Sequence, residues 1–177
     1  LTAEDARAYA NYALGVSCRN GHLSVVQFLT AHWGLAAEDA RMMNNYGLRW
    51  SCENGHLPAV QFIAAHWGLT VEDARAEGDA ALQMSCQNGP LPVAQFLAVH
   101  WEFTAEDARA HVNCAMRESC ANGHLAVVQF LAEHWGRLMI RVCMTTTHCR
   151  RDAQMATCLW CSSWRNTGGS RLRMHFL

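Results

Sequence analysis

Cysteine and histidine recur four residues apart in this sequence, a spacing that could serve metal binding. Three such pairs are present: Cys18 and His22, Cys52 and His56, and Cys120 and His124. A structural zinc ion takes four ligands, whereas each pair supplies two. Helices that pack side by side place neighbouring pairs about 10 Å apart, too far to share one ion. We therefore interpret the cysteines as small buried apolar groups and the histidines as partners of the turn backbone.

Adjacent acidic residues, such as Glu4 and Asp5, could in principle act as paired catalytic carboxylates, but that role needs a cleft. Each acidic pair instead lies at the start of a helical pattern, where the helix dipole stabilises negatively charged side chains. The sequence contains neither a glycine-rich phosphate loop nor a serine-nucleophile elbow. We expect no enzymatic activity, no cofactor, no bound metal and no small-molecule substrate.

The Cys/His pairs and the acidic pairs recur because residues 1–136 consist of a repeated unit. The stretch NGHLSVVQFLTAHWG, Asn20–Gly34, returns three more times with few changes. The units cover residues 1–34, 35–68, 69–102 and 103–136, each 34 residues long. A fixed period in this range indicates stacked units, each of which buries its apolar face against its neighbours.

Each unit opens with a helix start signal. Thr2, Thr70 and Thr104 precede an aspartate by three residues, an Asp variant of the capping box. Ala36 replaces the threonine in the second unit, so we expect a weaker cap there. This segment predicts a short capped turn.

Two main helices are expected after that turn. The first is predicted to begin at a second N-cap, which is Asn11, Asn45, Asp79 or Asn113 in the four units. An Asn-Gly turn then leads to a second helix from Leu23 to about Trp33. Gly34 can take the left-handed conformation that closes this helix, whereas Glu102 replaces it in the third unit at some cost. The predicted fold class is all-α, with little or no β-structure.

The helical part of each unit resembles the ankyrin repeat. Ser17 and Cys18 take the places of the family's paired alanines, and Asn20-Gly21-His22 takes the place of its turn. The second helix is similar at Val25, Val26, Phe28 and Leu29. The LTAEDAR segment stands in place of the hairpin finger, and the tryptophan of HWG extends the period from about 33 to 34 residues. The resemblance implies a helical solenoid that works as a protein-protein interaction scaffold.

The resemblance also implies where a protein partner would bind. In ankyrin-like folds, the loop before the first helix and the exposed side of that helix line a concave groove. Positions that differ between units are free to serve a partner, and Arg19, Glu53, Gln87 and Ala121 form one such set. The candidate partner-binding residues on or near the groove are Tyr9, Met42, Met43, Tyr46, Arg49, Trp50, Glu77, Gln83, His111 and Arg117. Alternatively, Trp50 and Met84 pack between repeats.

Charge and composition narrow the class of partner. Residues 1–136 contain 14 acidic residues and 7 arginines, a balance of −7, which argues against a nucleic-acid partner. No apolar run is long enough to span a membrane. Single cysteines within helical patterns favour a reducing, intracellular compartment. The chain begins with Leu1, so we interpret it as a fragment, and an array that targets an enzyme encoded elsewhere in the gene is an alternative function.

Residues 137–177 lose the repeat. Cys143, His148, Cys149 and CLWC at Cys158–Cys161 allow an alternative reading as a metal-binding module. However, CLWCSSWRNTGG, Cys158–Gly169, can be encoded so that a shifted reading frame spells PVVQFLAEHWG, nearly the fourth unit's AVVQFLAEHWG. We therefore interpret this tail as an out-of-frame translation of further repeats. Sequencing the coding DNA tests this hypothesis, because codons that encode no repeat in the shifted frame would refute it.

Overall fold

The structure is a computed structural model that describes residues 12–135, except for the side chains of residues 43–44, 78–79 and 108–113. The described part is helical and contains no strand. Residues 12–19 are helical and are followed by α2 (Leu23–Trp33), α3 (Ala37–Glu53), α4 (Leu57–Trp67), α5 (Val71–Asn88), α6 (Leu91–His100), α7 (Ala105–Ala121) and α8 (Leu125–Trp135). The all-α prediction is confirmed, and the predicted bounds of the second helix agree with those of α2.

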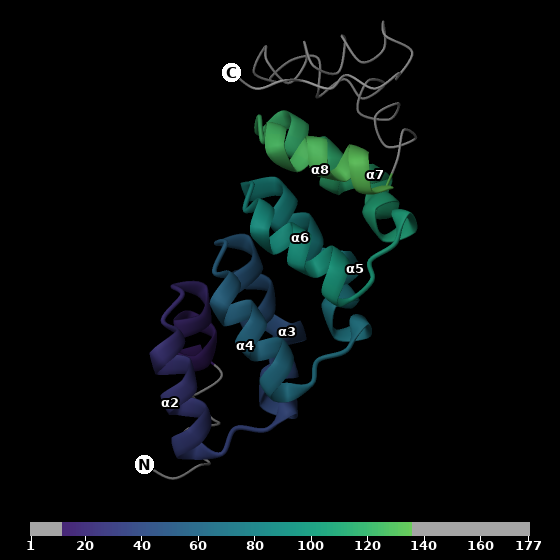
Figure 1. The fold of residues 1–177 in the computed structure, drawn as a ribbon. Coiled ribbons are helices and arrows are strands. Elements are labelled where there is room, and N and C mark those ends of the chain that lie inside the picture. The colour runs from purple at the N-terminus through teal and green to yellow at the C-terminus, as the bar shows by residue number, and fades with distance from the viewer. Residues whose placement is uncertain (1–11, 136–177) are drawn as a thin grey trace, which may run out of the picture.

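The helices form two parallel rows of stacked pairs (Figure 1). The long first helices of successive units pack against one another, α3 on α5 and α5 on α7. The shorter second helices do the same along α2, α4, α6 and α8. Within a unit, the long helix contacts the short one, as α3 contacts α4. The described chain is therefore a helical repeat in which successive pairs cover one another.

The core runs through the whole stack as columns of equivalent residues. Leu14, Leu48, Leu82 and Met116 form one column and are all buried. A second column contains Leu29, Ile63, Leu97 and Leu131, and a third contains Cys18, Cys52, Cys86 and Cys120. All twelve residues belong to one hydrophobic cluster. The repeat cysteines are therefore core residues, as the sequence predicts.

The predicted capped turn is the first turn of the long helix and not a separate element. At the start of α5, the backbone N–H of Thr70 donates to Oδ2 of Asp73 (2.8 Å) and the N–H of Asp73 donates to Oγ1 of Thr70 (3.4 Å). Thr104 caps α7 in the same way. In α3, the N–H of Ala36 donates to Asp39 (2.8 Å), but alanine has no oxygen to return the bond, which explains the weaker cap expected there.

The prediction that Asn45, Asp79 and Asn113 begin the first helix is wrong. These residues lie inside α3, α5 and α7, which are continuous from the capped turn onward. Asn45 is buried, and its Nδ2 donates to the carbonyl oxygen of Asp73 in the next unit (3.0 Å). Its backbone is left-handed, with φ of 57°, a conformation that asparagine tolerates better than most residues. The side chain that was expected to cap its own helix therefore links two units.

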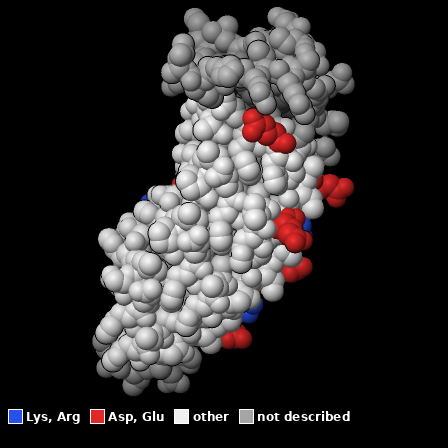
Figure 2. Space-filling view, viewed as in Figure 1, with Lys and Arg blue, Asp and Glu red and all other residues white. Residues whose placement is uncertain are grey.

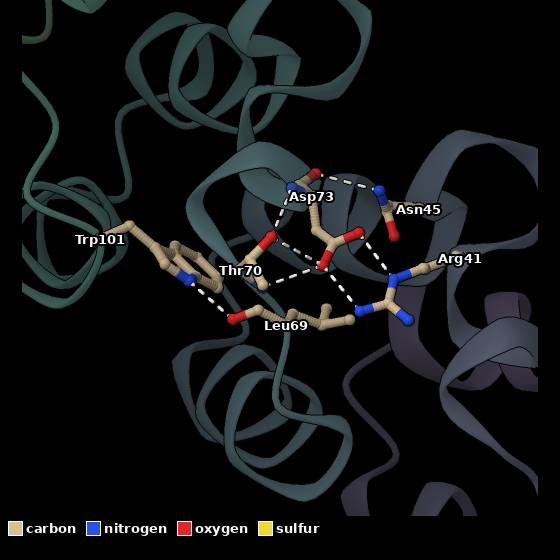
Figure 3. Close-up of polar contacts among 6 residues, drawn as sticks. All are labelled: Arg41, Asn45, Leu69, Thr70, Asp73 and Trp101. Atoms are coloured by element: carbon tan, nitrogen blue, oxygen red, sulfur yellow. Dashed lines mark hydrogen bonds and ion pairs between the residues drawn. The ribbon is translucent and has the colours of Figure 1, made fainter.

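The same carboxylates that complete the caps form ion pairs between units. Nε of Arg41 lies 2.8 Å from Oδ1 of Asp73 in the next unit (Figure 3), and Arg75 pairs with Asp107 at the same distance. The hydrogen bond from Arg41 holds the pKa of Asp73 below its ordinary value. Burial opposes this effect at Asp107, but the bonds from Arg75 and Thr104 lower its pKa as well. The EDAR motif thus joins each long helix to the next.

The tryptophan near the end of the second, third and fourth units closes each of these units. Nε1 of Trp67 donates to the carbonyl oxygen of Leu35 (3.0 Å), so that the end of the second unit is bonded to its beginning. Trp101 makes the equivalent bond to Leu69 (3.1 Å), drawn in Figure 3, and Trp135 makes it to Phe103 (3.0 Å). The residue that lengthens the period to 34 therefore has a structural role. The left-handed closing position follows it, at Gly68 and also at Glu102, whose φ is 50°.

The turn histidines contact the preceding unit and not only their own turn. Nε2 of His124 donates to the carbonyl oxygen of Gln87 in the third unit (2.8 Å). The ring of His56 covers Gly21 so closely that a Cβ there would lie 2.5 Å from Nδ1 of His56. Our expectation that these histidines bond the turn is therefore corrected: in the second and fourth units they pack on the neighbouring turn.

Within residues 12–135, no helix has both the length and the apolar content that crossing a bilayer requires.

Candidate functional site

Most candidate partner-binding residues lie along the row of long helices. Met42, Tyr46, Arg49 and Trp50 belong to α3, Glu77 and Gln83 to α5, and Arg117 to α7. Met42 and Glu77 are exposed and the other five are half-buried, so all seven are reachable from solvent. Tyr9 and the side chains of Met43 and His111 lie outside the described residues.

The structure brings two of these candidates together with an arginine from the first unit. The guanidinium carbon of Arg19 lies 4.2 Å from the centre of the Trp50 ring, a cation–π contact across the unit boundary. The rings of Tyr46 and Trp50 are 5.4 Å apart, centre to centre, and tilted by 49°. We call Arg19, Tyr46 and Trp50 the Trp50 cluster. Arginine, tyrosine and tryptophan are the residue types that contribute most to protein-protein binding energies.

A glycine of the first unit makes room for this cluster. A Cβ on Gly15 would lie 2.4 Å from Cδ1 of Tyr46, closer than van der Waals contact allows. Because glycine has no Cβ, the tyrosine ring can lie against the first helix and reach Trp50. Any larger residue at position 15 would displace Tyr46, so Gly15 positions the cluster without exposing a group of its own.

Sequence reasoning placed Arg19 among the variable positions but did not select it as a site residue. Arg19 could have been identified by comparing its position in the first unit with the position of Trp50 in the second. Arg19 is residue 19 of its unit and Trp50 is residue 16 of the next, so the two are three positions apart on neighbouring parallel helices. Side chains with that offset lie on the same face of a helix row.

The remaining candidates do not join the Trp50 cluster. Arg117 lies two units away, where its guanidinium pairs with Glu118 at 3.0 Å and Nη2 contacts Sγ of Cys114 at 3.7 Å. Glu77 has a left-handed backbone, with φ of 56°, inside α5. Met42 and Tyr46 line a small depression between the first two units, together with Leu14, Gly15 and Asp39. The described site is therefore concentrated on the first two units.

Charge on the described surface is mainly negative. Residues 12–135 contain 12 acidic residues and 6 arginines, and two of the arginines pair with the aspartates of the next unit. The first-turn glutamates of α3, α5 and α7, which are Glu38, Glu72 and Glu106, are exposed. Figure 2 shows acidic side chains along one edge of the molecule, whereas most of the visible face carries no charge. Arg19, which is exposed, is thus a local positive group within the acidic segment of residues 12–135.

The repeat cysteines are buried thiols that resist ionisation. Burial raises the pKa of Cys18 and of Cys86 to about 12 and raises that of Cys52 still further. A thiol that resists ionisation is a poor nucleophile and a poor metal ligand. Among the side chains that the structure describes, no three of His, Cys, Asp or Glu gather in a way that could hold a metal ion. The cysteine and histidine residues of the tail lie outside the described residues.

No family model and no curated protein sequence matches this chain.

Proposed function

We propose that this chain is an ankyrin-like solenoid that binds another protein through the Trp50 cluster and the variable surface of the long helices around it. Arg49, on the same helix, and Met42, at the adjoining depression, extend that surface. The protein acts as a scaffold in this proposal, without a cofactor and without chemistry of its own.

The observation that carries the proposal is that repeated and variable positions have different roles in the structure. Repeated residues form the core columns, the caps and the bonds between units, as Trp101 and Asp73 do. The Trp50 cluster instead uses positions that change from unit to unit. Trp50, for example, is replaced by Met84 in the third unit and by Glu118 in the fourth. A half-buried tryptophan beside an exposed arginine, at positions that differ from unit to unit, is typical of a binding surface.

Replacing Trp50 with alanine is expected to weaken partner binding at least ~10-fold, which corresponds to about 1.4 kcal/mol. The experiment first captures proteins on the immobilised full chain and identifies those that bind. Each is then produced separately, and its dissociation constant is measured by titration calorimetry against the wild type and the variant.

Two further variants make this experiment decisive. Arg19→Gln removes the cation–π partner of Trp50 at an exposed position, so it tests the cluster without opening the core. Val99→Ala changes an exposed apolar side chain on α6, in the other helix row, and should leave the affinity unchanged. Partners that bind both cluster variants as tightly as the wild type would contradict the proposed surface.

A further inference from the structure

One side of the first unit exposes residues that every later unit buries. Val25 of α2 is 41% exposed, whereas its equivalents Ala59, Val93 and Val127 are at most 1% exposed. Phe28, on the same helix, is 59% exposed, whereas Phe62, Phe96 and Phe130 are partly buried against the core. The sequence of this helix is nearly the same in all four units, so the difference lies in what covers it. The second, third and fourth units each follow another unit, and no described helix pair precedes the first.

Among the polar groups of the same side, the turn histidine shows the same difference. In the third and fourth units, Nδ2 of Asn88 donates to the carbonyl oxygen of Glu53 (3.2 Å), and Nδ2 of Asn122 donates to that of Gln87 (2.9 Å). Each asparagine thus bonds the unit before its own. In the second unit, however, Nδ2 of Asn54 donates to the carbonyl oxygen of Trp50 in its own helix, and the asparagines of all four units are exposed. The turn histidine does separate the first unit from the others, because His22 is exposed whereas His56 and His124 are half-buried. We call this surface of Val25, Phe28, Asn20 and His22 the leading face.

We propose that the leading face is an open stacking interface that binds one further helix pair of the same 34-residue type, joined ahead of the first unit in the same polypeptide. The interfaces already present define the chemistry of this occupant. It must offer a turn glycine for His22 to cover, as Gly21 does for His56. Carbonyl oxygens at its turn would accept from Asn20 where the junction resembles those of Asn88 with Glu53 and of Asn122 with Gln87.

The absence of charge also supports a helix pair as the occupant. The sequence of α2 is LSVVQFLTAHW, which contains no acidic residue, lysine or arginine. End units of helical repeats carry a polar outer face when they meet solvent. A surface with exposed valine and phenylalanine and no charged residue is instead typical of a surface that is covered in the folded assembly.

The test adds one unit to the full chain. A second copy of residues 35–68 is fused directly ahead of Leu1, which preserves the period because Gly68 is normally followed by Leu69. Hydroxyl-radical labelling of Phe28 is then measured by mass spectrometry in the original and the extended chain, with Phe96 as the internal reference. We expect labelling of Phe28 to fall at least ~5-fold on extension, toward that of Phe96, because the added unit covers it.

Two variants of the leading face separate specific stacking from a general effect of the added segment. Val25→Glu should leave the fold of the original chain intact, as judged by circular dichroism, because this side chain is already accessible. In the extended chain the same change should restore the labelling of Phe28. Val25→Ala should keep the protection, because alanine occupies this position in the second unit, at Ala59.

Two outcomes would overturn the proposal. Equal labelling of Phe28 in both chains would show that an added unit does not stack on the leading face. Protection of Phe28 in the original chain that increases with protein concentration, together with a larger mass in light scattering, would identify a second copy of the chain as the occupant instead.

Discussion

Replacing Trp101 with alanine is expected to lower the free energy of unfolding by about 3–5 kcal/mol, the range found when a large aromatic side chain is removed from a core. The indole is buried and lies against Phe96 and His100, with ring centres 5.9 and 5.1 Å away. Its Nε1–H also donates to the carbonyl oxygen of Leu69, which has few alternatives to this partner at a buried position. Chemical unfolding of the full chain, followed by circular dichroism, measures the change.

The hydrogen bond and the packing of Trp101 can be separated. Trp101→Phe keeps most of the apolar surface but leaves the Leu69 carbonyl oxygen without its donor, so about 1–3 kcal/mol of the loss should remain. Val99→Ala, an exposed change two residues away, should alter stability by no more than about 0.5 kcal/mol. If Trp101→Ala were as mild as Val99→Ala, the tryptophan would not close the unit in the way the structure indicates.

The repeat cysteines are expected to react with thiol reagents at least ~100-fold more slowly in the folded protein than in the unfolded chain. Burial raises the pKa of Cys18 and Cys86 to about 12. At pH 8, about one thiol in 10,000 is ionised when its pKa is about 12, against roughly one in four for a thiol of ordinary pKa, about 8.5, and only the thiolate reacts. Burial also keeps the reagent away from the sulfur, so the two effects act in the same direction.

Alkylation with iodoacetamide at pH 8, read peptide by peptide by mass spectrometry, measures this difference. Cys114 is the internal control, because it is half-buried on α7 and should be modified before Cys86 and Cys120. The same reaction in denaturant should modify all of them at similar rates. Fast modification of Cys86 without denaturant would show that the stack opens readily and that these residues do not form a closed core.

The features of the fold that could be predicted from the sequence are those that depend on neighbouring residues within one unit. The second helix and its glycine cap follow from local apolar spacing and a residue that tolerates positive φ, and α2 with Gly34 agrees with that prediction. The threonine caps of α5 and α7 follow in the same way. These signals lie within a few residues of the structure that they specify.

The wrong prediction at Asn45 has the opposite origin. The local sequence around an asparagine in a helical pattern is the same whether its side chain caps its own helix or bonds a neighbouring helix. The partner that decides, the carbonyl oxygen of Asp73, is 28 residues away and enters only when the units stack. Arg19 was not selected for a related reason, because its contact with Trp50 becomes visible only when the registers of two units are aligned.

The hydrogen bonds and ion pairs between units run in fixed directions along the stack, and this has an evolutionary consequence. Asn122 and Ser119 donate backward, to carbonyl oxygens of the preceding unit, while Arg41 and Arg75 reach forward to the aspartate that follows. The junctions of the second unit with the third and of the third with the fourth share the Arg–Asp pair and the backward asparagine bond, so they have the same polarity. A tandem duplication or deletion of one 34-residue cassette in the gene creates a junction identical in kind to those already present. Unequal recombination can thus change the length of the array without requiring compensating mutations, while substitutions at positions such as that of Trp50 alter what each copy recognises.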